Sequence, residues 1–358
     1  MRIIGVAGTA KNTGKTTTIS ALLMGLSRTP SIVVGLTSIG YDGEEIDNIT
    51  GLLKPRLFLK KGNVVATAAS CLRVGNAELE ILEQTNIMTP LGRISIAKVK
   101  RDGLVVVAGP NKSQDLKIVI EIMIEKAGCD IVLVDGALNR IVPMTVTEGL
   151  ILATGAARNP NVIELAEETR LICSILDRPE VGERYKKIVK DLELKTIAVI
   201  NNDNTVKVIR YPALIHDDIA EVLNEHITDK ACGIYIPAAV SQPVLNKLVE
   251  ILDNRLQGFT IILSDPIKLL ISGQPSKIMD MIKKIESLKG RIEVLKKVPV
   301  LAVTINPFYP CYSFEKGLYE PAYVDEKFLK EEMKKAISLP VFDVIKDGSE
   351  SLIKILGF

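Results

Sequence analysis

Residues 8 to 18 read GTAKNTGKTTT and directly follow the apolar run IIGV. A strand, a glycine loop and a helix that opens with GKT form a cradle for phosphate, because backbone N–H groups and the helix N-terminus point at the anion. In such a cradle Lys15 would bridge the β and γ phosphates, and Thr16 would offer its hydroxyl to Mg²⁺. The residues that we predict to bind the nucleotide here are Gly8, Thr9, Lys11, Asn12, Thr13, Gly14, Lys15, Thr16 and Thr17.

A second feature is the alternation of short apolar runs with helical patterns. Such continuous runs are typical of parallel strands that are covered on both faces. The predicted strands are RIIGVAG (2–8), SIVVGLT (31–37), DIVLVDG (130–136), GLILATG (149–155), TIAVIN (196–201) and GIYIP (233–237). Helical patterns separate them, as in SQDLKIVIEIMIEKAG and NVIELAEETRLICSIL. The pattern predicts an α/β fold with a doubly wound, mostly parallel sheet.

Two stretches depart from this rhythm. Between about residues 55 and 110 short strands and turns replace it, with KKGN and KRDG as expected hairpin turns, so we predict a β-rich insertion. After about residue 245 a second alternation begins, running from FTIILSDP (259–266) to PVFDVI (340–345). We therefore expect a nucleoside triphosphatase (NTPase) domain over 1–245, and over 246–358 either a smaller α/β domain or an extension of the first sheet.

The run DIVLVDG ends with Asp135 before its last glycine. A carboxylate at the end of an apolar strand, downstream of a phosphate loop, is suited to hold Mg²⁺ directly or through water. The alternative is a strand-ending aspartate that caps the next turn. We predict the metal role, with Lys15 and Asp135 as catalytic residues and Thr16 and Asp135 as metal ligands.

Composition narrows the classes of partner. The net charge is +2, from 45 basic and 43 acidic residues, which gives no reason to expect nucleic acid. The five cysteines occur singly, without metal-site spacing, so we expect buried free thiols in a cytoplasmic protein. Only two histidines occur, His216 and His226, which disfavours a histidine-dependent mechanism. No apolar span suggests a membrane segment.

The loop itself departs from the usual G-x-x-x-x-G-K-[ST] spacing, since its first glycine, Gly8, stands one place early. In this form it resembles the loops of dethiobiotin synthetase and of the cobyrinate and cobyric acid amide synthases, in the SIMIBI class of P-loop NTPases. The MinD group of that class has a further lysine five residues before the loop lysine. That place is Ala10 here, with Lys11 one position off, so the role of that lysine is not transferred.

The resemblance implies two further site residues. Asp42, in LTSIGYDGEE, holds the place of a residue that faces the γ phosphate, so we predict it as a further catalytic residue and metal ligand that orients water or metal. The alternative is that it simply forms a turn with Gly43. An asparagine at a strand end contacts adenine in these synthetases. Asn201 and Asn306 both fit, and strand order favours Asn201. The guanine-selecting NKxD element is absent from both places, so we expect ATP rather than GTP, with Mg²⁺.

GTAKNTGKTTT, LTSIGYDG, DGALNR and ILATGAA together resemble the reactivase subunit of the B12-dependent lysine 5,6-aminomutase, over roughly residues 1 to 245. This resemblance implies an ATPase that acts as an accessory factor, exchanging cobalamin on a partner mutase. The expected partners are thus a nucleotide and a protein such as that mutase or its reactivation complex. A homodimer is left open, and neither nucleic acid nor a membrane is expected.

Two alternatives remain at this point. The first is an ATP-dependent ligase of the dethiobiotin synthetase type, which would grip a small carboxylic acid with Lys11, Lys54 or Arg140. Against it, Asn12 stands where those enzymes have an acidic residue, and no glutaminase half with a cysteine nucleophile follows. The second is a nucleotide-binding regulator with little turnover.

Overall fold

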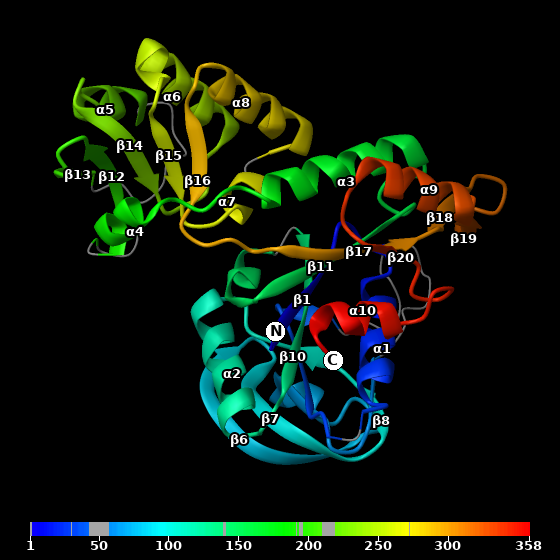
Figure 1. The fold of residues 1–358 in the computed structure, drawn as a ribbon. Coiled ribbons are helices and arrows are strands. Elements are labelled where there is room, and N and C mark those ends of the chain that lie inside the picture. The colour runs from blue at the N-terminus through cyan, green and yellow to red at the C-terminus, as the bar shows by residue number, and fades with distance from the viewer. Residues whose placement is uncertain are drawn as a thin grey trace. The chain divides into compact units, whose positions relative to one another are not determined.

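The computed structural model describes residues 2–29, 31–42, 57–138, 141–190, 192, 196–209, 219–271 and 273–358. The chain divides into two compact units, Met1–Thr169 together with Pro299–Phe358, and Arg170–Val298. Each unit contains a sheet of its own (Figure 1).

The sheet of the first unit is mostly parallel. From one edge to the other its strands are β20 (Val341–Phe342), β17 (Val300–Asn306), β11 (Gly149–Gly155), β1 (Ile3–Gly8), β10 (Ile131–Ala137), β2 (Val34–Ser38), β5 (Val64–Ala68), β7 (Gly92–Arg101) and β6 (Glu78–Thr89). All neighbours from β20 to β5 run parallel, and only β7 and β6 are antiparallel. The predicted α/β fold with a mostly parallel sheet is confirmed.

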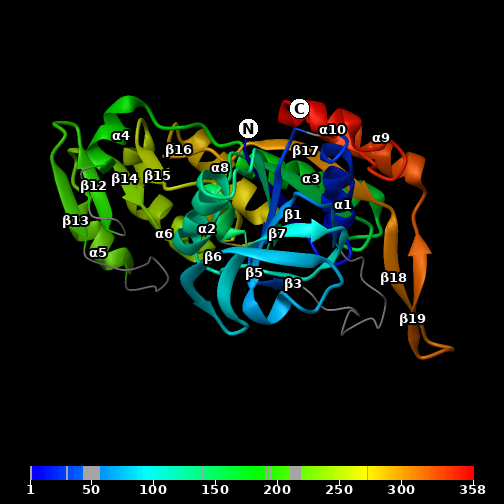
Figure 2. The ribbon, with the colours of Figure 1, turned by 90° about the horizontal axis from the view of Figure 1, so that it is seen from below.

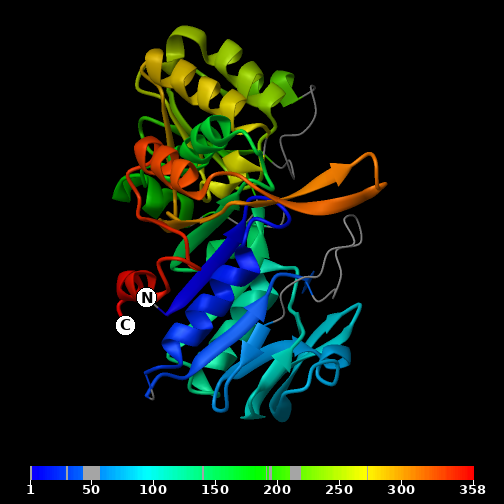
Figure 3. The same cartoon turned by 90° about the vertical axis from the view of Figure 1, so that its right-hand side faces the viewer.

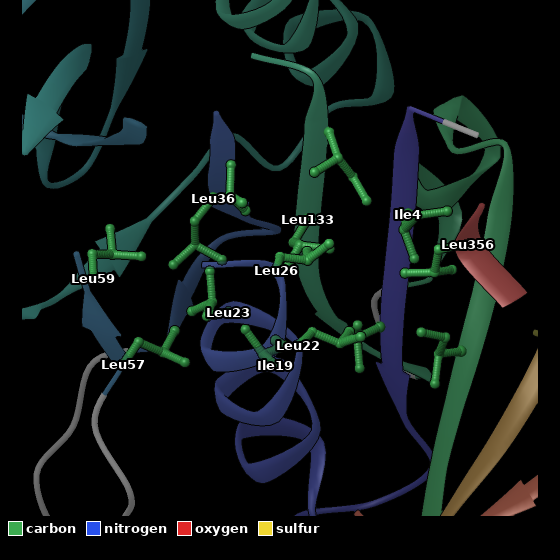
Figure 4. Packing of buried hydrophobic residues seen from close by; sticks show 14 of the residues in the cluster. Ile4, Ile19, Leu22, Leu23, Leu26, Leu36, Leu57, Leu59, Leu133 and Leu356 are labelled. Atoms are coloured by element: carbon green, nitrogen blue, oxygen red, sulfur yellow. The ribbon is translucent and has the colours of Figure 1, made fainter. Parts of the chain in front are cut away.

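Helices pack on both faces of this sheet. On one face, Leu22 and Leu26 of α1 (Lys15–Leu26) share a core with Ile4 of β1, and α10 (Glu350–Leu356) adds Leu356 to it (Figure 4). On the other face α2 (Ser113–Glu125) places Met123 against Gly35 of β2. This two-sided burial explains why the strands are apolar throughout rather than alternating.

The strand order fixes where a ligand can bind. β10 lies between β1 and β2, whereas β11 lies on the other side of β1, after the 3-10 helix η3 (Val142–Val146). The connection from β1 therefore runs to β2 on one side, whereas the connection from β10 runs to β11 on the other side. In open α/β sheets ligands bind at the carboxyl ends of the strands beside such a point. The loop that follows Gly8 begins there.

Short strands occupy the stretch where a β-rich insertion was expected, and its turns differ from the expected ones. It comprises β4 (Leu57–Leu59), β5, the 3-10 helix η1 (Ala69–Cys71), β6, β7, β8 (Gly103–Val105) and β9 (Val107–Ala108), and β9 pairs with β3 (Tyr41–Asp42). KKGN and KRDG were expected to be hairpin turns, but β4 pairs with β8 rather than with β5. The hairpin instead joins β6 to β7, where Thr89 pairs with Gly92. Gly92 has φ +99°, a left-handed conformation that a short hairpin turn requires.

The second unit has a mixed five-stranded sheet, ordered β13 (Val206–Ile209), β12 (Ile197–Asn201), β14 (Ala231–Ile236), β15 (Thr260–Leu263) and β16 (Arg291–Val294). Its helices are α4 (Glu183–Lys190), α5 (Ile219–His226), α6 (Gln242–Leu252), α7 (Ile267–Leu270) and α8 (Pro275–Ser287), with the 3-10 helix η4 (Asp253–Leu256). The boundary between the units falls within α3 (Val162–Leu176).

This division differs from the expected boundary at residue 245. TIAVIN and GIYIP form strands of the second sheet, and VPVLAVTINP becomes β17, which pairs with β11 in the first. The first unit is completed by the antiparallel strands β18 (Phe308–Ser313) and β19 (Leu318–Tyr323), by α9 (Glu326–Ala336), and by β20 and α10. An apolar run predicts a strand equally well for either sheet, so the pattern could not show that the chain returns to the first sheet at β17.

Among the residues that the structure describes, no helix is long and apolar enough to cross a membrane.

Four of the cysteines are buried as expected, but Cys311 on β18 is exposed. Burial raises the pKa of the Cys129 and Cys173 thiols to about 12 in each case.

These environments predict selective thiol chemistry. Because the thiolate is the reactive form, a disulfide reagent at pH 8 should modify one cysteine of the folded protein rapidly, and the others after unfolding in guanidinium. Replacing Cys311→Ser should remove the rapid phase. Any rapid equivalent that remains in that variant would contradict the burial of the other thiols.

Candidate nucleotide site

The loop between β1 and α1 has the backbone of an anion cradle. Asn12 and Gly14 have φ of 62° and 87°, so the chain curls back before α1 begins. A Cβ on Gly14 would lie 3.0 Å from Cβ of Asn306, which adds a spatial need for glycine to the conformational one. The N-terminus of α1 has no side-chain cap and no acidic residue in its first turn. Its N–H groups and dipole therefore remain suited to an anion.

Threonine hydroxyls hold this loop in place. Thr9 Oγ1 donates to Thr154 Oγ1 at 2.9 Å, and Thr13 Oγ1 donates to Ala10 O at 2.9 Å. Thr18 Oγ1 lies 2.8 Å from Thr304 Oγ1, which ties α1 to β17. Thr9 and Thr13 were predicted to bind the nucleotide. Their side chains are buried in these contacts, so what they present to a ligand is their backbone.

Lys15 and Asp135 meet at the mouth of the loop. Lys15 Nζ lies 2.9 Å from Asp135 Oδ1, and the two side chains are only 12% and 3% exposed. Asp135 pairs in register with Val6 of β1, which places its carboxylate just below the loop. The fold brings the predicted phosphate-binding lysine and the predicted metal ligand into contact.

The donor set around Asp135 suits a metal that is shared with a phosphate. No cluster of three or more histidine, cysteine or acidic side chains that could hold a metal occurs in the described ranges. Mg²⁺ commonly uses one or two carboxylates and completes its shell with water and phosphate oxygens. Thr16, half-buried in the first turn of α1, directly follows the lysine that contacts Asp135. Asp135 and Thr16 therefore fit Mg²⁺ that arrives with a nucleotide, rather than a metal held by protein alone.

Other predicted residues have different surroundings. Lys11 is exposed on the loop and Thr17 is half-buried in α1. The backbone of Asp42 pairs with Val107, while its side chain lies outside what the structure describes. Lys54 and Arg140 also lie outside the described residues.

Of the two asparagines, it is Asn306 that contacts the loop. Its Nδ2 donates to Asn12 O at 2.9 Å, and its backbone oxygen accepts from Ala156 N at 2.9 Å. Asn201 belongs to the second unit, at the end of β12, where Nδ2 donates to Thr205 Oγ1 at 2.9 Å. Strand order favoured Asn201, because the pattern did not reveal that TIAVIN joins the second sheet.

Sequence reasoning did not single out Arg158. It follows β11, and its Nη1 donates to Thr9 O at 2.6 Å. Its other nitrogens form a two-point ion pair with Glu168 of α3, with distances of 2.8 and 2.5 Å. A planar guanidinium suits such a bidentate contact, so Arg158 braces the start of the loop against α3. The available signal was an arginine three residues beyond a glycine that ends a buried strand.

No protein-family model matches the chain, and no curated protein matches it. Among solved structures, it has a weak likeness to the structure of pNOB8 ParA bound to nonspecific DNA, with 11% sequence identity and a TM-score of 0.26. The match covers 79% of this chain and 99% of the other. A likeness of this size supports no inference about fold or function.

Proposed function

We propose that the first unit binds ATP with Mg²⁺ and hydrolyses it. The observation that carries the proposal is the contact of Lys15 with buried Asp135 beneath a glycine loop whose helix N-terminus is uncapped. A lysine, a helix N-terminus and a strand-end carboxylate together form the usual equipment for phosphoryl transfer.

Each group has a distinct role in this proposal. The loop N–H groups and Lys15 bind the phosphates, while Thr16 and Asp135 hold Mg²⁺, which neutralises charge on the β and γ oxygens. The Lys15–Asp135 ion pair has to open for this, because the lysine is needed at the phosphates and the carboxylate at the metal. The pair thereby keeps both buried charges compensated until phosphate and metal arrive together.

The choice of ATP over GTP rests on the chain beside the loop. Asn306 is followed by Pro307 and Phe308, so the aspartate-containing NKxD element that selects guanine is absent there. Asn306 is the asparagine that we assign to the base side of the site, in place of Asn201, because of its hydrogen bond to Asn12.

We further propose that the ATPase acts as an accessory factor for a partner protein. The support is the resemblance of four short segments to the reactivase of a B12-dependent aminomutase. To test it, phosphate release is measured for the protein alone and then with the mutase and cobalamin, and in the second case mutase activity is followed at the same time. Faster hydrolysis together with recovery of an inactivated mutase is expected. Hydrolysis that the mutase leaves unchanged would count against this partner, without affecting the ATP site.

The ATP site has its own test in Asp135→Asn. This variant should still bind ATP when Mg²⁺ is absent, but its Mg²⁺-dependent hydrolysis should fall by about 100-fold or more, since the carboxylate that holds the metal is lost. Binding is measured by calorimetry and hydrolysis by phosphate release.

A matched control is Asp130, which directly precedes β10, the strand that carries Asp135. The carboxylate of Asp130 accepts a hydrogen bond from Val33 N at 2.8 Å, away from the loop. Asp130→Asn should leave hydrolysis close to that of the unmodified protein. Equal hydrolysis by the two variants would remove Asp135 from the site.

A further inference from the structure

The hairpin of β18 and β19 holds a concentration of aromatic side chains. The chain has seven phenylalanines, eight tyrosines and no tryptophan, and six of these rings lie between Phe308 and Tyr323. In Figures 2 and 3 the hairpin stands out from the body of the first unit. Phe314 at its tip is 90% exposed and Tyr323 is 66% exposed. Exposed aromatic clusters of this kind mark interaction sites.

One side of the hairpin consists of rings and prolines alone. Side chains of paired residues share a face, and the pairs alternate between faces along the hairpin. On one side, which we call the aromatic face, are Phe308, Pro310, Tyr312, Tyr319, Pro321 and Tyr323. Rings pack edge to face within it, with centroids 5.7 Å apart for Phe308 and Tyr323 and 5.2 Å apart for Tyr312 and Tyr319. The face carries no charged side chain.

The prolines limit how a partner can bind. Pro310 and Pro321 are directly opposite one another. Neither has an N–H group, so they can only form a pair whose backbone nitrogens point outward, which removes a donor from each edge of the hairpin. Addition of a further strand is therefore disfavoured on both edges. A partner has to lie on the aromatic face instead.

Size and charge limit what the partner is. The strands have six residues each, so the face is about 20 Å long and about 10 Å wide. A stable dimer needs about 800 Å² per subunit, several times this area, which disfavours a second copy as the occupant. Nucleic acid is disfavoured because the face lacks cations, and Lys316 in the turn is paired with Glu320.

We propose that the aromatic face binds an extended, proline-containing segment of a partner protein. Six residues of polyproline II helix span about 19 Å, which matches the face. Such segments dock on aromatic rings, and their backbone carbonyls are free to accept hydrogen bonds. Tyr312, Tyr319 and Tyr323 offer hydroxyl donors, and none of the three hydroxyls has a hydrogen-bond partner in the described part of the chain.

The hairpin is also joined to the candidate nucleotide site. Asn306 Nδ2 donates to Asn12 O in the loop, and Asn306 Oδ1 accepts from Phe308 N at 3.3 Å, the first residue of the aromatic face. A segment bound to the aromatic face would therefore lie next to Asn306, whose side chain contacts the loop. The binding itself requires no nucleotide, so it can be tested apart from the proposed hydrolysis.

The absence of tryptophan allows a specific reporter. In the full chain with Phe314→Trp, and without nucleotide, decaproline should shift the tryptophan emission in a saturable way. Adding Tyr312→Ala should weaken the binding about tenfold or more, as expected when an aromatic contact of the face is lost. Tyr309→Ala, on the opposite side of the hairpin, should change it little. Tyr312→Phe keeps the ring and should lose less affinity than Tyr312→Ala, which guards against an unfolded hairpin.

Four results would overturn the proposal. One is no saturable shift at millimolar decaproline, and another is an equal loss in Tyr309→Ala and Tyr312→Ala. The third is a shift that follows protein concentration, together with a dimer in sedimentation. The fourth is a shift caused by a ten-nucleotide thymidine strand instead of the peptide. Each would assign the face to another role while leaving the ATP site untouched.

Discussion

Replacing Lys15→Ala is expected to lower ATP hydrolysis by about 100- to 1,000-fold and to weaken ATP binding, because the lysine supplies the side-chain charge at the phosphates. The measurement is phosphate release at saturating Mg²⁺, with calorimetry for binding. A suitable control is Lys126→Ala, which breaks the exposed ion pair to Glu83 at 3.0 Å and should leave hydrolysis unchanged.

Stability has to be separated from binding in this variant. Asp135 is buried, and removing the Lys15 ammonium breaks a buried ion pair, which costs about 3–5 kcal/mol. The double variant Lys15→Ala/Asp135→Asn also removes the charge of Asp135, so it should recover stability but still fail to bind ATP without Mg²⁺. Asp135→Asn alone should bind it. If the double variant binds ATP as well as Asp135→Asn does, Lys15 is not a phosphate ligand.

The sequence predicted those parts of the fold and site that depend on local pattern. Continuous apolar runs identified β1, β10 and β11, because strands covered on both faces have no exposed side to mark with polar residues. The loop motif and the strand-end aspartate indicated Lys15 and Asp135. Lys15 and Asp135 are 2.9 Å apart because β1, which leads into the loop before Lys15, and β10, which carries Asp135, are parallel neighbours in the sheet.

What the sequence could not predict depends on partners far away in the chain. β17 lies beside β11 only because the chain returns from the second unit, and this return places Asn306 at the loop. Arg158 gains its role from Thr9 O and Glu168, which no local pattern links to it. The β18–β19 hairpin likewise follows β17 without any helix, against the alternation used to predict the rest.

Gly155→Ala should show how closely the loop depends on β17. Gly155 ends β11 opposite Asn306, and a Cβ there would lie 2.2 Å from Asn306 O. Since this is backbone, the end of β17 would have to move, at a cost of about 3 kcal/mol. The move would also stretch the hydrogen bond from Ala156 N to Asn306 O and the contact of Asn306 with Asn12. We expect lower stability in urea unfolding and weaker ATP binding.

Gly182→Ala is the matched control, because nothing lies within 4 Å of a Cβ at that position. Its stability should stay within about 0.5 kcal/mol of the unmodified protein. If Gly155→Ala loses stability but binds ATP normally, the contact is structural and Asn306 does not position the loop. If the variant loses both stability and ATP binding, then β17 is part of the nucleotide site, although no sequence pattern places this strand beside β11. The β18–β19 hairpin, which follows β17, is then anchored to the same site.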